Sequence, residues 1–178
     1  METALRELEK EKLVQLFNPP YTESDSIYPG RLADYPPGIR ENAGQYSHGV
    51  SWLVDALLVL SDMAQKKGLA EDHRRYRSRA VDLWRKISPL SHLGADDMAV
   101  YGLPPHQQAA DVSSGPGYEG RGGWSWYTGG AGRMLYAAYG LFGLRMEGGR
   151  LIQPPDLHEP RGSLMIKRIV HVPMDGER

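Results

Sequence analysis

Aromatic, hydroxyl and glycine residues gather in the tract of residues 121–130, directly before a helix-like run. Thr128 stands where the N-cap of that helix would be, and Gly129 begins a first turn of small residues. Small residues leave backbone N–H groups open at the positive end of the helix dipole, where anions bind. The aromatic residues at 124, 126 and 127 offer flat surfaces for sugar rings. We therefore predict an anion site, such as a phosphate site, at Thr128, with an ordinary N-cap as the alternative.

A second polar tract, residues 40–48, lies at the start of the most apolar helix predicted in the chain. In that helix, residues 43–66, the side chains of Gln45, His48 and Trp52 share one stripe because spacings of three and four fall on one helix face. Such a stripe is suited to line a ligand site. Helix capping with one buried, hydrogen-bonded histidine explains the same residues equally well, and the residues alone leave both interpretations open.

Other signals for chemistry are weak. Gly115, Gly117 and Gly120 match the dinucleotide pattern G-x-G-x-x-G, but Pro116 interrupts it and no helix opens after it, which favours a loop. The histidines lack metal-ligand spacing, there is no cysteine, and no G-x-S-x-G elbow is present, so we predict neither a metal site nor serine hydrolase chemistry. A net charge of −1 with 40% hydrophobic residues indicates a globular protein and argues against a nucleic-acid surface.

The elements that position these tracts are helices joined by long loops. Periodic apolar residues predict helices over 3–17, 43–66, 71–88 and 130–142, loops over 21–42 and 91–123, and strands after residue 149. Helix 43–66 is apolar on more than one face, which predicts burial on most sides. Helix 71–88 has one apolar stripe and many arginines, which predicts a surface position. Such a pair is typical of the inner and outer layers of a helical barrel.

Together the tracts YPPGIRENAGQYSHGVSWLVDAL, AADV and GRGGWSWYTGGAGRM resemble the inverting glycoside phosphorylases of glycoside hydrolase family 94. The preceding loop is most similar to the C-terminal phosphorylase-like domain of cyclic β-1,2-glucan synthases. The resemblance covers nearly the whole chain. It implies a mainly α fold, the C-terminal segment of an (α/α)₆ barrel with a short C-terminal β portion, with barrel helices and ordered loops over residues 1–148 and a β segment of the same domain over 149–178.

The resemblance also implies roles for single residues. His48, Thr128 and Gly129 match the family's phosphate-binding residues. The remaining matches concern the sugar site, either lining it or shaping its loop, and are Glu41, Gln45, Tyr46, Arg121 and Trp124. The family's reaction is phosphorolysis of a β-glucosidic bond with inversion, in which phosphate attacks the anomeric carbon and a carboxylic acid protonates the leaving oxygen. Inorganic phosphate is then a co-substrate, and no cofactor is expected.

Several expectations concern what lies outside these tracts. The family's general acid belongs to a motif that would precede residue 1, so we expect no catalytic residue in this chain and no activity from it alone. We expect the partners to be a β-glucan oligosaccharide, phosphate and the upstream remainder of a parent chain, and we expect self-association of the isolated chain. The expected location is the cytoplasm, with the parent anchored in a bacterial inner membrane.

Some positions depart from the family pattern. Pro104 replaces a glutamate, Gly130 replaces a serine and Arg133 replaces a tryptophan. These departures keep a second interpretation open, a non-catalytic carbohydrate-binding or regulatory module derived from the family. A helical scaffold without a ligand is the third.

Overall fold

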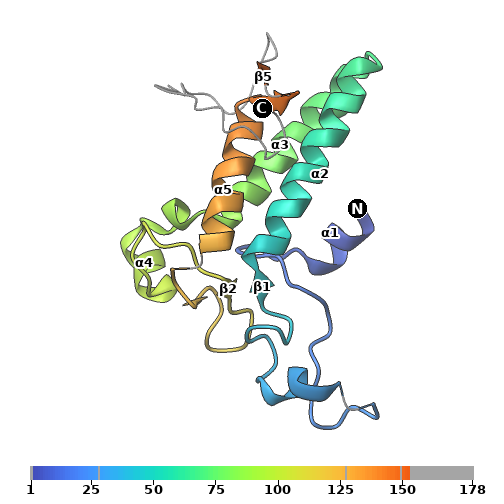
Figure 1. Cartoon of the computed structure of the whole chain (residues 1–178). Coiled ribbons are helices and arrows are strands. Elements are labelled where there is room, and N and C mark those ends of the chain that lie inside the picture. Colours follow the sequence, from blue (N-terminus) through green and yellow to red (C-terminus); the bar gives the residue numbers. More distant parts are fainter. Residues whose placement is uncertain (1, 28, 127, 149, 153–178) are drawn as a thin grey trace, which may run out of the picture.

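The computed structural model describes residues 2–27, 29–126, 128–148 and 150–152. The order of elements (Figure 1) is α1 (Glu2–Leu8), η1 (Gly30–Asp34), β1 (Gln45–Tyr46), α2 (Ser47–Lys66), α3 (Ala70–Ile87), η2 (Pro89–His92), α4 (Ala95–Tyr101), β2 (Asp111–Val112), β3 (Gly122–Gly123), α5 (Thr128–Leu141), β4 (Arg145–Glu147) and β5 (Arg150–Ile152).

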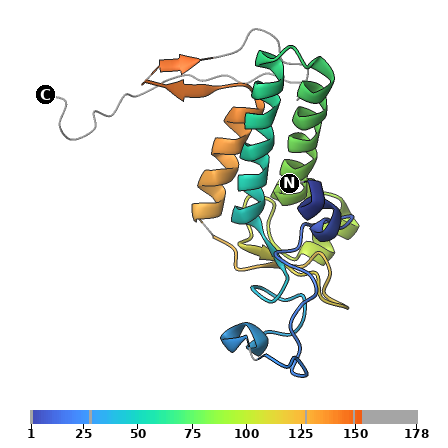
Figure 2. The same cartoon turned by 90° about the vertical axis from the view of Figure 1, so that its right-hand side faces the viewer.

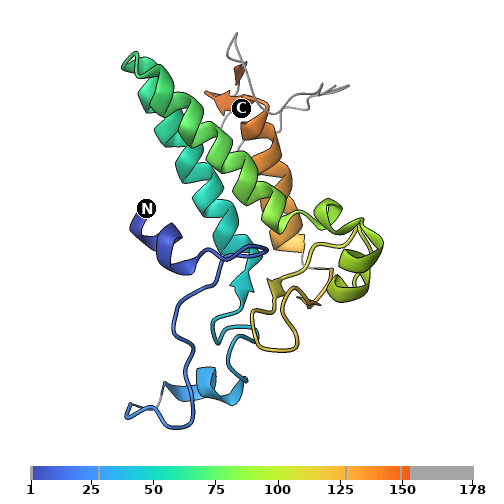
Figure 3. The same ribbon diagram turned by 180° about the vertical axis from the view of Figure 1, so that it is seen from behind.

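Helices α2, α3 and α5 form one packed layer, which Figure 3 shows from behind. The apolar faces of α2 and α3 meet in a core that includes Val54, Leu57 and Leu83, and α5 adds Ala137. Polar contacts connect the helices as well: the Trp84 indole N–H donates to the carbonyl of Met134 at 3.2 Å, joining α3 to α5. Burial of these apolar side chains is the main stabilising contribution in this layer.

A small antiparallel sheet in the order β1-β2-β3 lies at one end of this layer. Its register places Asp111 opposite both Tyr46 and Gly123. Figures 1 and 2 show that α2 and α5 both begin at this end and run away from the sheet in the same direction. The sheet therefore brings the tract around residue 45 beside the tract around residue 122.

The mainly α class is confirmed, and so are the helices predicted at 43–66, 71–88 and 130–142, as α2, α3 and α5. The predicted helix 3–17 is wrong beyond Leu8, because the chain turns back in a bridge between Glu9 and Val14 and buries Leu13 in a second core with Tyr101 and Val112. The prediction for the loop 91–123 missed α4.

Helix α2 is also less covered than its sequence predicts. Trp52, Val59 and Met63 expose about half of their surface, because no described element packs on that face. Hairpin β4–β5 begins at Arg145, before the predicted strand region, and the strand expected near residues 163–173 lies outside the described residues. Barrel closure and the division at residue 148 stay predictions. No helix in the described part of the chain has the length and apolar character to cross a membrane.

Asn42 orders the long loop before β1. Its buried side chain donates to the carbonyls of Tyr21 at 3.0 Å and Tyr35 at 2.8 Å, and its Oδ1 accepts the N–H of Tyr21 at 2.8 Å. One amide therefore fastens both ends of the 21–42 loop, which explains how a proline-rich segment of this length stays folded.

Replacing Asn42 by aspartate should lower the free energy of unfolding by about 2–4 kcal/mol, because an acceptor would then face both carbonyls in place of a donor. Urea unfolding measures the change. Asn18 is the chain's other asparagine and is exposed, so Asn18→Asp is the matched control and should change stability by less than about 0.5 kcal/mol. Equal losses in both variants would contradict the role of Asn42.

Candidate functional site

A cavity of about 560 Å³ opens at the sheet end of the helical layer. Residues from the 21–42 loop, β1, α2 and β2–β3 converge on it, so its lining depends on the sheet register. The lining consists of Leu16, Arg40, Glu41, Tyr46, Trp52, Ala110, Asp111 and Trp124. A neighbouring cavity of about 430 Å³ shares Arg40, Asp111 and Trp124 with it and is bounded further by Arg121 and Tyr118.

An aromatic row leads from β1 into α2 along one side of the cavity. The ring of His48 lies 5.9 Å from that of Tyr46, in a stacked arrangement, and 5.2 Å from that of Trp52, edge to face. His48 and Trp52 are one helical turn apart, as the predicted stripe requires. Tyr46 and Trp52 line the cavity itself, and His48 lies between them. This row offers ring surfaces together with imidazole nitrogens.

Arg40 faces the aromatic row from the other side. Its guanidinium carbon lies 4.5 Å from the Trp124 ring centroid and 5.2 Å from that of Tyr35, so the cation is held between two aromatic rings. Arg40 Nε lies 3.5 Å from Glu41 Oε2, an ion-pair distance, but makes no hydrogen bond within the described residues. Attraction to two rings and one carboxylate fixes a positive charge at the cavity edge.

The backbone around the cavity adopts conformations that side chains disfavour. Positive φ angles occur at Arg40 (49°), Ala43 (69°), Trp124 (50°) and Trp126 (67°). Non-glycine residues in this region carry a free-energy cost and cluster at functional sites. Here the positive angles turn the chain on both sides of the sheet, at the positions that present Arg40 and Trp124 to each other.

Asp111 lies where both cavities meet. Burial raises the pKa of its carboxyl above the ordinary value, Arg40 partly offsets this by lowering the pKa, and Glu41 raises it further. The opposite strand residue is Gly123, and a β-carbon there would lie 2.6 Å from Asp111 Oδ2. The carboxylate therefore occupies space that only a glycine at position 123 leaves open.

The predicted phosphate residues lie at helix starts on the same side of the molecule. His48 is in the first turn of α2, and α5 begins with Thr128 and Gly129. Thr128 is thus the first helical residue rather than the N-cap. Its side chain lies outside the described part of the structure, so its hydroxyl role stays a prediction. Because α2 and α5 start at the same end, their dipoles present positive ends side by side (Figures 1 and 2).

The structure brings most of the predicted sugar-site residues together. Glu41, Tyr46 and Trp124 line the first cavity, and Arg121 lines the second. Gln45 is different: it lies in β1 rather than in a helix, is fully buried, and accepts the N–H of Val14 at 2.8 Å through Oε1. It holds the N-terminal segment against the sheet and is not part of the cavity lining.

Arg40 and Asp111 had no predicted role, although both line the two cavities. Arg40 lies in the tract RENAGQYSH and Asp111 in the tract AADV, both of which carry the family resemblance. Their roles depend on contacts between tracts, Arg40 with Trp124 and Asp111 with Gly123, which only the sheet register creates. The charge of each residue inside these two tracts is the only signal by which the sequence could have indicated them.

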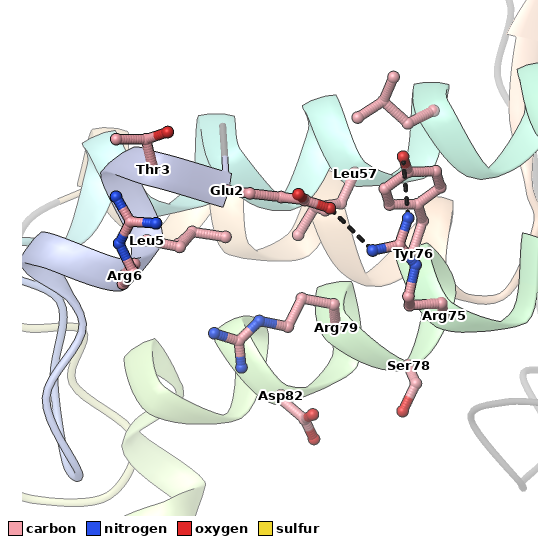
Figure 4. Close-up of a pocket in the computed structure, with 11 residues that line it drawn as sticks. Glu2, Thr3, Leu5, Arg6, Leu57, Arg75, Tyr76, Ser78, Arg79 and Asp82 are labelled. Carbon is pink, nitrogen blue, oxygen red and sulfur yellow. Dashed lines mark hydrogen bonds and ion pairs between the residues drawn. The ribbon is translucent and has the colours of Figure 1, made fainter. Parts of the chain in front are cut away.

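A larger cavity of about 1020 Å³ separates α1 from α3 and is shown in Figure 4. Its charged side chains are already matched: Arg75 pairs with Glu2 at 2.7 Å and with Asp72 at 3.0 Å, and Arg79 pairs with Glu9. The Arg75–Glu2 pair joins α1 to α3, and the Arg79–Glu9 pair joins the residue directly after α1 to α3. We therefore regard this cavity as a gap between packed helices rather than as the functional site.

The glycine-rich tract of residues 115–120 forms a turn between β2 and β3, which confirms the loop interpretation. Gly115 lies against the carbonyl of Pro37, where a β-carbon would be 2.7 Å from the oxygen. The glycine is explained by this close crossing of two loops. Among the described residues no group of three histidine, aspartate or glutamate side chains is placed to hold a metal ion.

Comparison with known proteins agrees with this geometry. Residues 1–142 match the family model described as the glycosyl hydrolase 94 superfamily, catalytic domain. Over 153 residues the chain is 37% identical to the cyclic beta-(1,2)-glucan synthase NdvB of Rhizobium meliloti (strain 1021), an alignment that covers 83% of this chain and 5% of that relative. The match therefore concerns a small part of a much longer protein. By the family model, which covers most of its length, the chain belongs to the glycosyl hydrolase 94 superfamily, within the catalytic domain.

Proposed function

We propose that this chain forms the phosphate and saccharide pocket of a glycoside phosphorylase-like domain that acts on β-1,2-linked glucan. The observation that carries the proposal is the cavity between Arg40, Tyr46, Trp52 and Trp124. It lies at the sheet end of the molecule, where α2 and α5 both begin (Figure 1). Membership of the family and the similarity to a cyclic beta-(1,2)-glucan synthase support the class of substrate.

The chemistry of each group fits such a pocket. Aromatic rings pack against the apolar faces of sugar rings, while charged and amide groups select hydroxyl positions. Phosphate requires positive potential, which the paired helix starts and the Arg40 guanidinium supply. His48 packs between Tyr46 and Trp52, which line the cavity, and in this proposal its imidazole donates a hydrogen bond to a phosphate oxygen.

In the proposed reaction these residues bind and orient the reactants. Phosphate held near His48 and the start of α5 attacks the anomeric carbon of a glucosyl unit packed on Trp124. The glycosidic oxygen leaves with a proton from a carboxylic acid, and the product is glucose 1-phosphate of inverted configuration. We assign the proton to a residue preceding this segment, as the family resemblance implies, and require no cofactor.

The remaining expectations are part of the same proposal. We place the neighbouring part of the catalytic domain on the face of α2 that exposes Trp52, Val59 and Met63, and on the exposed Leu135 and Tyr136 of α5. Without that neighbour, the face would support self-association of the isolated chain. We propose a cytoplasmic location, with the parent protein held at a bacterial inner membrane.

The test is phosphorolysis by the protein that carries this sequence, measured as release of α-glucose 1-phosphate from a β-1,2-linked glucan. In His48→Ala we expect the phosphate concentration for half-saturation to rise by about 10-fold, with that for the glucan changed by less than about twofold. His48→Gln, which keeps a hydrogen-bond donor, should recover part of the loss. If the protein binds the glucan but never consumes phosphate, a non-catalytic carbohydrate-binding module replaces this proposal.

A further inference from the structure

The carboxylate of Asp111 is a strong acceptor with no assigned role. We propose that it is a saccharide-binding residue, which accepts hydrogen bonds from adjacent hydroxyl groups of one sugar ring at the junction of the two cavities. The inference rests on the proposed carbohydrate pocket and names the residue that would determine which hydroxyl pattern it accepts.

The position of Asp111 is fixed by the sheet. It lies on the central strand β2, with Tyr46 opposite on β1 and Gly123 opposite on β3. Because neighbouring strands hold it on both sides, its backbone has little freedom to move. Together with Arg40 and Trp124 it contributes to the walls of both cavities, so a ligand in either one meets this carboxylate.

Gly123 leaves space for the carboxylate. A β-carbon at position 123 would lie 2.6 Å from Oδ2 and 3.0 Å from Oδ1, distances that force the side chain to move. The backbone of Gly123 does not adopt the left-handed conformation, so an alanine would be acceptable there but for Asp111. Glycine is therefore required at position 123 because the Asp111 carboxylate occupies the space that a β-carbon would take.

The carboxylate also has unused acceptor capacity. Within the described residues it makes no side-chain hydrogen bond or ion pair, although it is partly buried. The charged groups facing it are Arg40, which lies over Trp124, and Glu41. A sugar that enters the cavity would displace water from the carboxylate. Because a carboxylate without hydrogen-bond donors is unfavourable, hydroxyl groups of the sugar must replace the hydrogen bonds from that water. Adjacent hydroxyl groups on a sugar ring match the two oxygens of a carboxylate, while Trp124 offers its ring to the same sugar.

Binding is measured by tryptophan fluorescence, since Trp52 and Trp124 both line the first cavity. The probe is a β-1,2-linked glucose disaccharide titrated without phosphate into the protein that carries this sequence. Asp111→Asn should weaken binding by about 10-fold. Gly123→Ala, which displaces the carboxylate without removing it, should cause a loss of similar size. Asp82→Asn, at a partly exposed position on α3, and Gly132→Ala, where nothing lies within 4 Å of the new β-carbon, are the matched controls.

Stability separates this role from a structural one. The folded-state pKa of Asp111 is raised by burial, so its ionised form opposes folding once the pH exceeds the unfolded-state pKa. Asp111→Asn should therefore keep or increase the melting temperature at neutral pH, and the difference should vanish in acid, where both states are protonated. Weaker binding by a protein of undiminished stability supports the inference.

Other outcomes overturn it. Binding within twofold of the wild type in both Asp111→Asn and Gly123→Ala would remove Asp111 from the saccharide site. Loss of phosphorolysis with unchanged binding would make Asp111 a proton donor or acceptor instead. A wild-type protein that binds no saccharide excludes the inference as well. Binding that depends on Asp111 but is never followed by phosphorolysis leaves the inference standing and rejects the proposed function.

Discussion

Replacing Gly38 by alanine is expected to lower the free energy of unfolding by about 3–5 kcal/mol. Gly38 has a φ of 81°, and a β-carbon there would lie 2.3 Å from the backbone nitrogen of Gly115 and 2.5 Å from its Cα. Backbone atoms cannot rotate away as a side chain can. Relief would require the 21–42 and 113–120 loops to separate, which would break the 2.8 Å hydrogen bond from the Ser114 N–H to the carbonyl of Gly38.

Gly117→Ala is the matched control for Gly38→Ala. Gly117 has nearly the same φ, 80°, but nothing lies within 4 Å of the place that a β-carbon would take there. This variant therefore carries the conformational cost of a left-handed alanine alone, about 1–2 kcal/mol. Urea unfolding of both variants measures the difference between them, which is the cost of the loop crossing. Equal destabilisation would mean that the crossing at Gly115 is not tightly packed.

The loop crossing matters to the site because each of the two crossing loops adjoins one of its charged groups in the sequence. Gly38 is two residues before Arg40, and the segment 113–115 directly follows β2, which carries Asp111. Separating the loops would move Arg40 relative to Asp111 and Trp124. We expect Gly38→Ala to lose saccharide binding along with stability, whereas Asn18→Asp and Gly117→Ala should bind normally when folded.

The helical part of the fold was predictable because its signal is local. Apolar residues repeat at helical spacing through α2, α3 and α5, and no distant contact is needed to recognise them. The prediction of a helix over 3–17 is wrong beyond Leu8. Leu13 extends the apolar stripe of that predicted helix, but it packs in the separate core around Tyr101. Tertiary burial there outweighed the periodic pattern.

The site was predictable only where its residues belong to a recognisable motif. Tyr46 and Trp124, which line the cavity, were identified from the tracts that contain them, and the role of His48 stays a prediction. Gln45 was misplaced because strand β1 is set by pairing with Val112, a partner far along the chain that local spacing does not reveal. The contacts of Arg40 and Asp111 arise between tracts, so their importance follows from the sheet and not from either tract.

Removing the indole of Trp124 is expected to weaken saccharide binding by about 30- to 100-fold, a larger loss than at any other cavity residue. Trp124 is 69% exposed, so Trp124→Ala should cost little stability. The cation–aromatic contact with Arg40 would be lost as well, which would release the guanidinium from the cavity edge. Titration of the glucose disaccharide by calorimetry measures the loss without depending on the removed fluorophore.

Trp126→Ala is the matched control for Trp124→Ala, because it removes an exposed indole of the same kind outside the two cavities. Trp126 is also exposed, at 73%, and also has a positive φ. It lines neither of the two cavities, and its ring centroid lies 6.3 Å from that of His106. If exposed aromatic area alone attracted the sugar, the two variants would lose affinity equally. Binding in the cavity beside Arg40 and Asp111 requires Trp124 and should leave Trp126→Ala within about threefold of the wild type. The ratio of the two losses therefore locates the sugar relative to β3.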